Sequence, residues 1–359
     1  MSVPQGSPQK PETRVSLFDP SYVVQMLGAI LSLLAGKLMQ LVLSPGTFSV
    51  ASLLCALSIA TIFVASKRRG RPVRPRVLLR ALFPRRLRRS RSTRADIAFF
   101  FFSFFLVGAL FGWAVLSLQV IDNATNQLLV ATFGTQPARL SGWAGAGLMT
   151  VVLFVAYELG YWIDHYLSHN VPFLWEFHKV HHTAEVLSPL TNFRVHPVDT
   201  IVFNNILAVV MGVAAGLAHY GLGHGTAPLT IANSNVFVVV FFFLIGHLQH
   251  THFWIAFTGV WGRIILSPAH HQIHHSTDPR HFNKNLGSFL AVWDWMFGTL
   301  YMPSKRRQQI NFGVEPKGAE AHTVTGGLVS PILRAAEHLT RKPQPVAVRN
   351  STLAPAPEL

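Results

Sequence analysis

The sequence predicts an all-α integral membrane protein with about six membrane-spanning helices and a cytoplasmic, histidine-rich helical cap that carries a two-metal site. Three observations predict this class. Half of the 359 residues are hydrophobic and 13% are charged, whereas a soluble domain carries about 25% charged residues. Several apolar runs are close to the roughly 20 residues that a bilayer-crossing helix needs. Sixteen of the eighteen histidines lie between His165 and His281.

Four regions follow one another along the chain. Residues 1–20 are polar and predict a disordered N-terminal tail. Residues 21–95 predict a transmembrane hairpin, turned at Pro45-Gly46, and a basic cytoplasmic loop. Residues 96–302 predict a membrane-embedded catalytic domain, and residues 303–359 predict a partly disordered C-terminal tail. The membrane-spanning helices of the whole chain are expected to form one or two hairpins. The expected spans are 22–44, 47–66, 96–120, 142–164, 200–220 and 229–249.

The loop from Lys67 to Arg94 sets the expected orientation. It holds thirteen of the thirty basic residues and no acidic residue, and such loops stay on the cytoplasmic side of a membrane. This topological role explains the net charge of +15, so no nucleic-acid partner is expected. Counting spans from this loop places every histidine cluster on the cytoplasmic side. Arginine-rich loops and a C-terminus without a retrieval signal favour a bacterial inner membrane, with the ER membrane as the alternative.

The histidines occur at spacings that suit metal ligation. The clusters are His165-x-x-x-His169, His178-x-x-His181-His182 and His271-x-x-His274-His275. Residues three and four apart share one face of a helix, so each cluster can direct two or three imidazoles at one point. One ion rarely takes more than about four protein ligands. Eight clustered histidines therefore predict a site for two ions.

Further polar residues lie near these clusters. A ninth ligand is expected from the end of the sixth span, with His250 preferred over His247 and His252. Other side chains could hold an imidazole in the required tautomer. These candidates are Glu158, Asp164, Glu176, His196, Asp199, His247, His252, His270 and Asp278. Glu158 lies inside a span, where a carboxylate is a functional candidate; the structural alternative is a bond to a neighbouring helix.

The choice of metal depends on more than the ligand type, because imidazole suits zinc as well as iron. Eight or nine histidines suit two ions with open positions for a small oxidant, at a place that lipid chains can reach. Both features favour iron. The single cysteine, Cys55, excludes an iron–sulfur cluster within the chain. No Glu lies between His165 and His169, so the metalloprotease motif is absent.

The order of these motifs resembles the fatty acid hydroxylase superfamily, also called the sterol desaturase family. The resemblance covers residues 150–302 and is closest to the alkylglycerol-monooxygenase-like and bacterial branch. Beside the three clusters, it rests on Arg194-x-His196-Pro197, His250-Thr-His252, Ser267-Pro268-Ala-His270-His271, Asn283-Lys-Asn285-Leu-Gly287 and Trp293-Asp294-Trp-Met-Phe297-Gly298-Thr299.

The resemblance implies a membrane-bound non-haem di-iron oxygenase. It would use O2 and two electrons to hydroxylate an unactivated C–H bond of a lipid, with zinc as a substitute for iron. The lipid, a sterol, fatty acyl chain, ether lipid or aminolipid, would enter from the bilayer, and a separate electron-transfer protein would supply the electrons. The implied catalytic ligands are His165, His169, His178, His181, His182, His271, His274 and His275, with His250 as the ninth metal ligand.

Two alternatives remain open. A lipid or sterol desaturase would use the same two-metal centre, and product analysis would distinguish it. A membrane metal transporter or metal sensor belongs to another class. Transporters place ionisable ligands near the membrane midplane, whereas these clusters lie at the ends of spans that are nearly free of charge. The transporter is therefore the weaker hypothesis.

Overall fold

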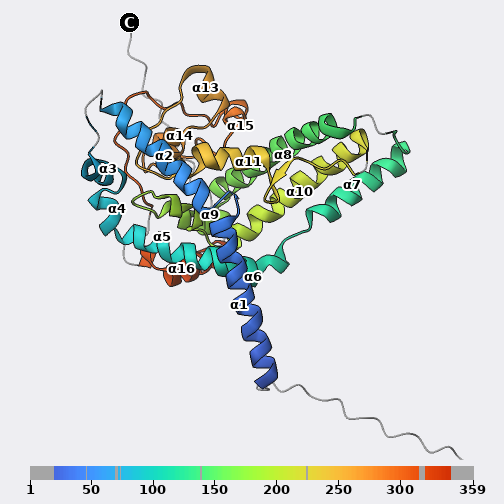
Figure 1. The fold of residues 1–359 in the computed structure, drawn as a ribbon, viewed down its shortest axis with the longest axis horizontal. Helices are drawn as coiled ribbons and strands as arrows, with labels where there is room; N and C mark the ends of the chain where they lie inside the picture. The colour runs from blue at the N-terminus through green and yellow to red at the C-terminus, as the bar shows by residue number, and fades with distance from the viewer. Residues whose placement is uncertain are drawn as a thin grey trace, which may run out of the picture.

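The computed structural model describes residues 20–45, 47–68, 72, 74–137, 140–223, 225–314 and 320–340. In these residues the chain is helical apart from one small β-hairpin, so the all-α class is confirmed (Figure 1). The helices are α1 (Pro20–Leu43), α2 (Val50–Lys67), α3 (Pro75–Leu82), α4 (Arg85–Arg89), α5 (Arg91–Phe102), α6 (Gly108–Phe111), α7 (Leu118–Phe133), α8 (Gly142–Asn170), α9 (Pro172–His182), α10 (Pro197–Leu222), α11 (Val236–Phe241), α12 (His247–Gln249), α13 (Gly259–Ile264), α14 (Pro268–His274), α15 (Val292–Met296) and α16 (Val324–Thr340).

Short helical turns and the hairpin complete the list of elements. Two π-helical turns are η1 (Ser103–Val107) and η4 (Phe242–Gly246). The 3-10 turns are η2 (Gly112–Ala114), η3 (Pro189–Phe193), η5 (Pro279–His281) and η6 (Glu320–His322). The antiparallel strands β1 (Thr230–Ile231) and β2 (Ser234–Asn235) pair Thr230 with Asn235.

Several helices have the length and composition of membrane spans. In the described residues these are α1, α2, the stretch Arg91–Phe133, α8 and α10, and a shorter apolar stretch runs over Val236–Gln249. The chain is therefore an integral membrane protein. The helix α8 has 29 residues and is about 43 Å long at 1.5 Å per residue, which exceeds the roughly 30 Å of a bilayer core. Its C-terminal end can therefore extend beyond the membrane.

The region expected to be an outer loop, residues 121–141, contains most of a helix instead. The helix α7 packs along α10 because two glycines of α10 let the backbones approach. A Cβ atom at Gly216 would lie 2.5 Å from Cβ of Thr125, and one at Gly212 would lie 2.7 Å from Cβ of Ile121. The expected span 96–120 is broken by η1 and η2 before α7 begins. Polar residues spaced along α7 hid this helix from a search for apolar runs.

The N-terminal helices do not form the expected hairpin. Figure 1 shows α1 leaving the body nearly in line with α2, and no residue of α1 is buried. The helix α2 is attached to the body of the protein instead. Ser49 and Ser52, its buried capping pair, lie at its start, and Ser52 Oγ is 2.9 Å from His247 Nε2. The contact with the histidine-bearing region thus fixes the direction of α2.

The C-terminal region contains a docked helix. Arg334 of α16 donates to Glu176 of α9 at 2.8 Å, and Lys179 also pairs with that carboxylate. His196 Nε2 donates to the carbonyl of Leu328 at 3.0 Å. Part of the expected tail therefore covers α9. Residues 1–19 and 341–359 lie outside the described residues, so the disorder expected for them stays a prediction.

Candidate metal centre

The structure brings all nine expected histidine ligands together in two groups. Within each group, one nitrogen from every imidazole lies within 4.8 Å of the others. Group one is His165 and His169 of α8, His178 and His182 of α9, and His274 of α14. Group two is His181 of α9, His250 after α12, and His271 and His275 of α14 and its C-cap. Four separate segments therefore converge on one place.

Each His-x-x-His-His motif contributes to both groups. His181 and His182 are neighbours in α9, yet they point into different groups, because successive side chains on a helix are about 100° apart. The motif on α14 is divided in the same way between His274 and the pair His271 and His275. The rings of His182 and His275 stack across the boundary with centroids 4.5 Å apart. The two groups are therefore immediate neighbours.

Backbone and carboxylate acceptors orient the rings of group one. His165 Nδ1 donates to the carbonyl of Leu286 at 2.7 Å, and His274 Nδ1 donates to the carbonyl of Lys284 at 3.0 Å. His178 Nδ1 lies 3.3 Å from both carboxylate oxygens of Asp199. A carbonyl can only accept, so in His165 and His274 the proton is on Nδ1. The lone pair of Nε2 is then free for a metal.

The loop that supplies these two carbonyls is rigidly held. Asn283 and Asn285 have positive φ angles of 55° and 56°, a conformation that Asn tolerates better than most residues. The fully buried amide of Asn285 donates to the carbonyl of His270 and accepts from the N–H of Tyr301 at 2.7 Å. The carboxylate of Asp294 accepts from the backbone N–H groups of Leu286 and Gly287, each at 2.8 Å. The two C-terminal sequence motifs therefore build the support for group one.

Group two is packed differently. His250 Nε2 lies 3.0 Å from His181 Nε2, 2.8 Å from His271 Nε2 and 3.1 Å from His275 Nε2. One proton on His250 Nε2 can satisfy only one of these three contacts. Nδ1 of His250 and His275 has no hydrogen-bond partner among the described residues, and His181 has only a weak contact with the backbone of Thr191. The Nε2 atoms meet at one point with fewer orienting acceptors than in group one.

The residues present fit a pair of metal ions. In group one, all five Nε2 atoms are buried without a hydrogen-bond partner in the described part of the chain. Buried polar atoms are normally paired, so five unpaired nitrogens around one point fit a bound cation. Neutral imidazole suits iron, zinc, copper and nickel. Both groups therefore have a donor set that fits a transition metal, while the donor set alone does not select iron.

Burial keeps most of these imidazoles neutral. Removal from solvent lowers the pKa of His181, His182, His271 and His275 well below the usual value. Burial lowers the pKa of His274 to about 3. His178 differs, because burial opposes its charged form but the Asp199 carboxylate outweighs burial and raises its pKa. Since a ligating imidazole must be unprotonated, the rings other than His178 are ready for a metal at neutral pH.

Glu158 and His196 hold structure around the centre rather than facing it. Glu158 Oε2 accepts from the N–H groups of Phe289 and Leu290 at 2.9 and 2.7 Å, just beyond the loop that supports group one. His196 caps α10 by accepting from Val198 N–H at 3.1 Å.

Four more candidates have partners of their own. His247 contacts Ser52, and His252 Nε2 donates to the carbonyl of Ala81 at 2.7 Å. His270 Nδ1 accepts from Ser267 N–H at 3.1 Å, which closes the cap of α14. Asp278 pairs with exposed Arg280. Among the expected carboxylates, Asp199 alone contacts a histidine of the two groups, and Glu176 belongs to the contact with α16.

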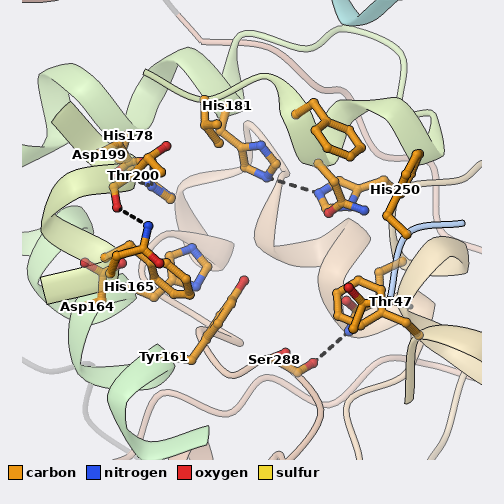
Figure 2. A pocket seen from close by; sticks show the side chains of 18 of the residues that line it. Thr47, Tyr161, Asp164, His165, His178, His181, Asp199, Thr200, His250 and Ser288 are labelled. Carbon is orange, nitrogen blue, oxygen red and sulfur yellow. Dashed lines mark hydrogen bonds and ion pairs between the residues drawn. The ribbon is translucent and has the colours of Figure 1, made fainter. Parts of the chain in front are cut away.

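A cavity of about 400 Å³ opens onto both groups. Figure 2 shows His165 and His178 of group one and His181 and His250 of group two along its wall. Tyr161 and Asp164 project from α8 into the same space. Phe203, Phe241 and Phe242 supply an apolar wall. This volume falls within the roughly 300–1,000 Å³ of small-molecule sites, so a small molecule can reach both histidine groups here.

Sequence reasoning missed part of this cavity. Thr47 and Phe48, from the link between α1 and α2, line it, and the Phe48 ring meets Phe193 edge-on at 4.4 Å between centroids. The link between α1 and α2 is therefore part of the wall of this cavity. The carbonyls of Lys284 and Leu286 were also missed, because any residue supplies a carbonyl and the sequence carries no signal for it.

Comparisons with known proteins agree with the arrangement of this centre. Residues 150–299 match the fatty acid hydroxylase family, and all nine histidines lie in this segment. The resemblance inferred from the motifs is therefore confirmed for this segment. No solved structure matches the chain.

Curated relatives cover only part of the chain. Ornithine lipid hydroxylase OlsE of Rhizobium tropici is 29% identical over 216 residues, which are 60% of each chain. Alkylglycerol monooxygenase of Danio rerio is 28% identical over 146 residues, or 41% of this chain and 29% of the relative. Very-long-chain aldehyde decarbonylase GL1-6 of Oryza sativa subsp. indica is 24% identical over 189 residues, or 50% and 28%. The chain thus spans less than two thirds of each relative.

Proposed function

We propose that the fatty acid hydroxylase domain of residues 150–299 holds two iron ions and hydroxylates a C–H bond of a membrane lipid. One atom of O2 enters the C–H bond, and the other leaves as water with two protons and two electrons. A separate electron-transfer protein supplies the electrons. The observation that carries the proposal is the convergence of nine imidazoles, eight of them buried, in two adjacent groups, with members of both groups on the wall of one cavity.

The chemistry of the metals and the work of the protein are separate. Bound iron supplies the capacity to activate O2 and oxidise a C–H bond, as cofactors do in other enzymes. Asp199 and the carbonyls of Lys284 and Leu286 orient three imidazoles. Phe203, Phe241 and Phe242 exclude water from the cavity and give an acyl or isoprenoid chain an apolar surface. Loss of this dry pocket would expose the reacting centre to solvent.

The class of lipid follows from the relatives as a proposal. Their printed names include a monooxygenase of alkylglycerols and a hydroxylase of ornithine lipids, so an ether lipid and an aminolipid are the first substrates to test. Desaturation at the same centre is the second candidate function. One relative is named for decarbonylation rather than hydroxylation, so product analysis must identify the reaction.

The membrane and the side of the centre also belong to this proposal. We place the chain in a bacterial inner membrane, with the ER membrane as the alternative and the histidine groups on the cytoplasmic side. The basic segment from Lys67 to Arg94 supports this orientation through the positive-inside rule. The test is the accessibility of cysteines introduced at exposed positions on α4 to a membrane-impermeant reagent, in intact and in opened cells.

The activity is tested with the full chain in lipid nanodiscs. Iron-loaded protein receives a reduced ferredoxin system, isotopically heavy O2 and a panel of ether lipids, aminolipids, fatty acyl lipids and sterols. Mass spectrometry should find one lipid class that gains a single heavy oxygen atom. His181→Ala should abolish this product, and His338→Ala, a change at the partly exposed ring on α16, should keep it. A product that lacks two hydrogens instead would favour desaturation, and no product from any class would contradict the proposal.

A further inference from the structure

Two adjoining cavities lie on the N-terminal side of the protein, away from the substrate cavity. One, of about 360 Å³, lies between α2, α3 and the residues after α12. The other, of about 270 Å³, lies between α4, residues 185–187 and residues 307–312. They share Leu87, Leu187, Thr251 and His252 as lining residues. Neither shares a lining residue with the cavity at the metals, so they form a separate, two-part site.

The first cavity is an apolar slot. Its walls include Leu53, Leu54 and Leu57 of α2, which face Leu82 and its neighbours from α3. The polar groups on its wall are already bonded within the protein: Thr251 Oγ1 donates to the carbonyl of Leu248, and His252 Nε2 donates to that of Ala81. An apolar cavity of this kind excludes water and accepts hydrocarbon. The slot therefore fits an acyl chain.

The second cavity carries two basic side chains on a partly apolar lining. Arg86 and Arg307 line it, and neither has an ion-pair partner within the described ranges of the chain. Glu185, an acidic residue of the same lining, lies 3.4 Å from His322 Nε2. Two guanidinium groups without an ion-pair partner in the described residues form a site for a phosphate, the anion that Arg recognises best.

We propose that the two cavities together bind one anionic phospholipid, such as phosphatidylglycerol. One acyl chain occupies the slot beside α2, and the phosphate lies against Arg86 and Arg307. The exposed leucines of α2 give the chain access from the bilayer. The net charge of +15 and the basic segment from Lys67 to Arg94 complement the anionic lipids of a cytoplasmic leaflet.

This lipid would join parts of the chain that frame the metal centre. The slot is bounded by Thr251, the residue after group-two ligand candidate His250, and by Val50 at the start of α2. Arg86 lies on α4, and Arg307 follows the fatty acid hydroxylase domain. The bound lipid would therefore hold α2 to α4 against residues 250–253. It also gives a role to His252, which lies between the two cavities and does not reach the metals.

The test is native mass spectrometry of the full chain in detergent, titrated with phosphatidylglycerol, phosphatidylcholine of the same chains, and glycerol phosphate. We expect one tightly held phosphatidylglycerol, weaker phosphatidylcholine and no binding of glycerol phosphate. The double variant Arg86→Gln/Arg307→Gln should weaken phosphatidylglycerol binding by at least about tenfold, as expected for charge-assisted bonds. The control Arg85→Gln/Arg89→Gln removes the same charge from α4 outside the cavity and should leave binding within about twofold.

A second variant tests the slot. Leu57→Trp fills it from a position that is 38% exposed, so the larger side chain is accommodated, and circular dichroism checks the fold. It should weaken phosphatidylglycerol and phosphatidylcholine alike. Three results would overturn the proposal. They are an equal loss of phosphatidylglycerol binding in both double arginine variants, unchanged phosphatidylglycerol binding in Leu57→Trp, and binding of glycerol phosphate as tight as that of phosphatidylglycerol. Oxidation of the bound lipid during turnover would also overturn it, since the lipid would then be substrate. None of these binding measurements depends on iron, so they stand or fall separately from the hydroxylase assignment.

Discussion

The two histidine groups consist of the same ligand type, imidazole, but they differ in the hydrogen bonds that orient the rings. Group one has five imidazoles, and three of them donate Nδ1 to a fixed acceptor: Leu286, Lys284 or Asp199. Group two has four imidazoles whose Nε2 atoms crowd within 2.8–3.1 Å of His250 Nε2. Orientation by such partners raises metal affinity. The difference teaches that group one is pre-organised and should hold its ion more tightly, while group two should be the labile site.

Loss of a ligand should have the largest effect, and it should differ between groups. His271→Ala leaves three imidazoles in group two, whereas His169→Ala leaves four in group one, enough for a closed site. We expect His271→Ala to lower metal content to about one ion per chain and His169→Ala to stay close to two. Turnover should be lost in both. Elemental analysis of the purified variants measures the number of metal ions per chain. Equal metal loss in the two variants would contradict the ranking of the groups.

Removal of an orienting partner should have the next largest effect. Asp199→Asn keeps the shape of the side chain but removes the charge beside His178 Nδ1. Metal affinity of group one should fall about 10- to 100-fold, measured by competition with a chelator of known affinity. Asp278→Asn is the matched control, because Asp278 pairs with exposed Arg280 and contacts no histidine of either group. A similar loss in both variants would show that net charge, not orientation, is responsible.

The pH dependence of metal release should identify His178. Its pKa is raised by Asp199, so protonation competes with the metal at a higher pH than at His182 or His274, whose pKa values are lowered by burial. The metal affinity of group one should therefore begin to fall as the pH drops through the raised pKa of His178, above the usual value of about 6.5. Asp199→Asn lowers that pKa, so its affinity, weaker at high pH, should begin to fall only at a lower pH, as chelator competition at a series of pH values would measure. An unchanged or higher onset would contradict the assignment.

The smallest effect should come from the support of the loop. Glu158 Oε2 accepts two backbone N–H groups, from Phe289 and Leu290. In Glu158→Gln an amide replaces the carboxylate, so the free energy of unfolding should fall by about 1–3 kcal/mol with little loss of metal. A thermal melt of the metal-loaded protein measures the change. Glu337→Gln, at an exposed position of α16, should leave the melting temperature unchanged; an equal drop in both variants would exclude a specific role for Glu158.

The sequence predicted which histidines meet, but not how they divide. Spacing within a helix places His178, His181 and His182 on adjacent faces, and this local geometry needs no tertiary information. The division of both His-x-x-His-His motifs between two groups depends on how α9 and α14 cross. That crossing is set by side-chain packing between segments about 90 residues apart in the chain, for which one sequence gives no direct signal.

Some elements of the fold could likewise be predicted from the sequence, and others could not. The long apolar helices α8 and α10 were predicted because composition alone marks them. The helix α7 was not, since it is stabilised by the close approach that Gly212 and Gly216 allow. The position of Phe48 in the substrate cavity was also hidden, because it depends on the direction in which α2 leaves the link after α1.

The most direct test of the two-ion centre is the metal content of the full chain, purified in detergent without a metal-chelating resin and reconstituted with iron under anaerobic conditions. Mass spectrometry of the elements and Mössbauer spectroscopy of the same sample give the number of irons and their environments. The structure predicts about two irons per chain in two distinct nitrogen environments, one of them released first by a chelator. One iron per folded chain, or two that are released together, would contradict the arrangement of a pre-organised and a labile group.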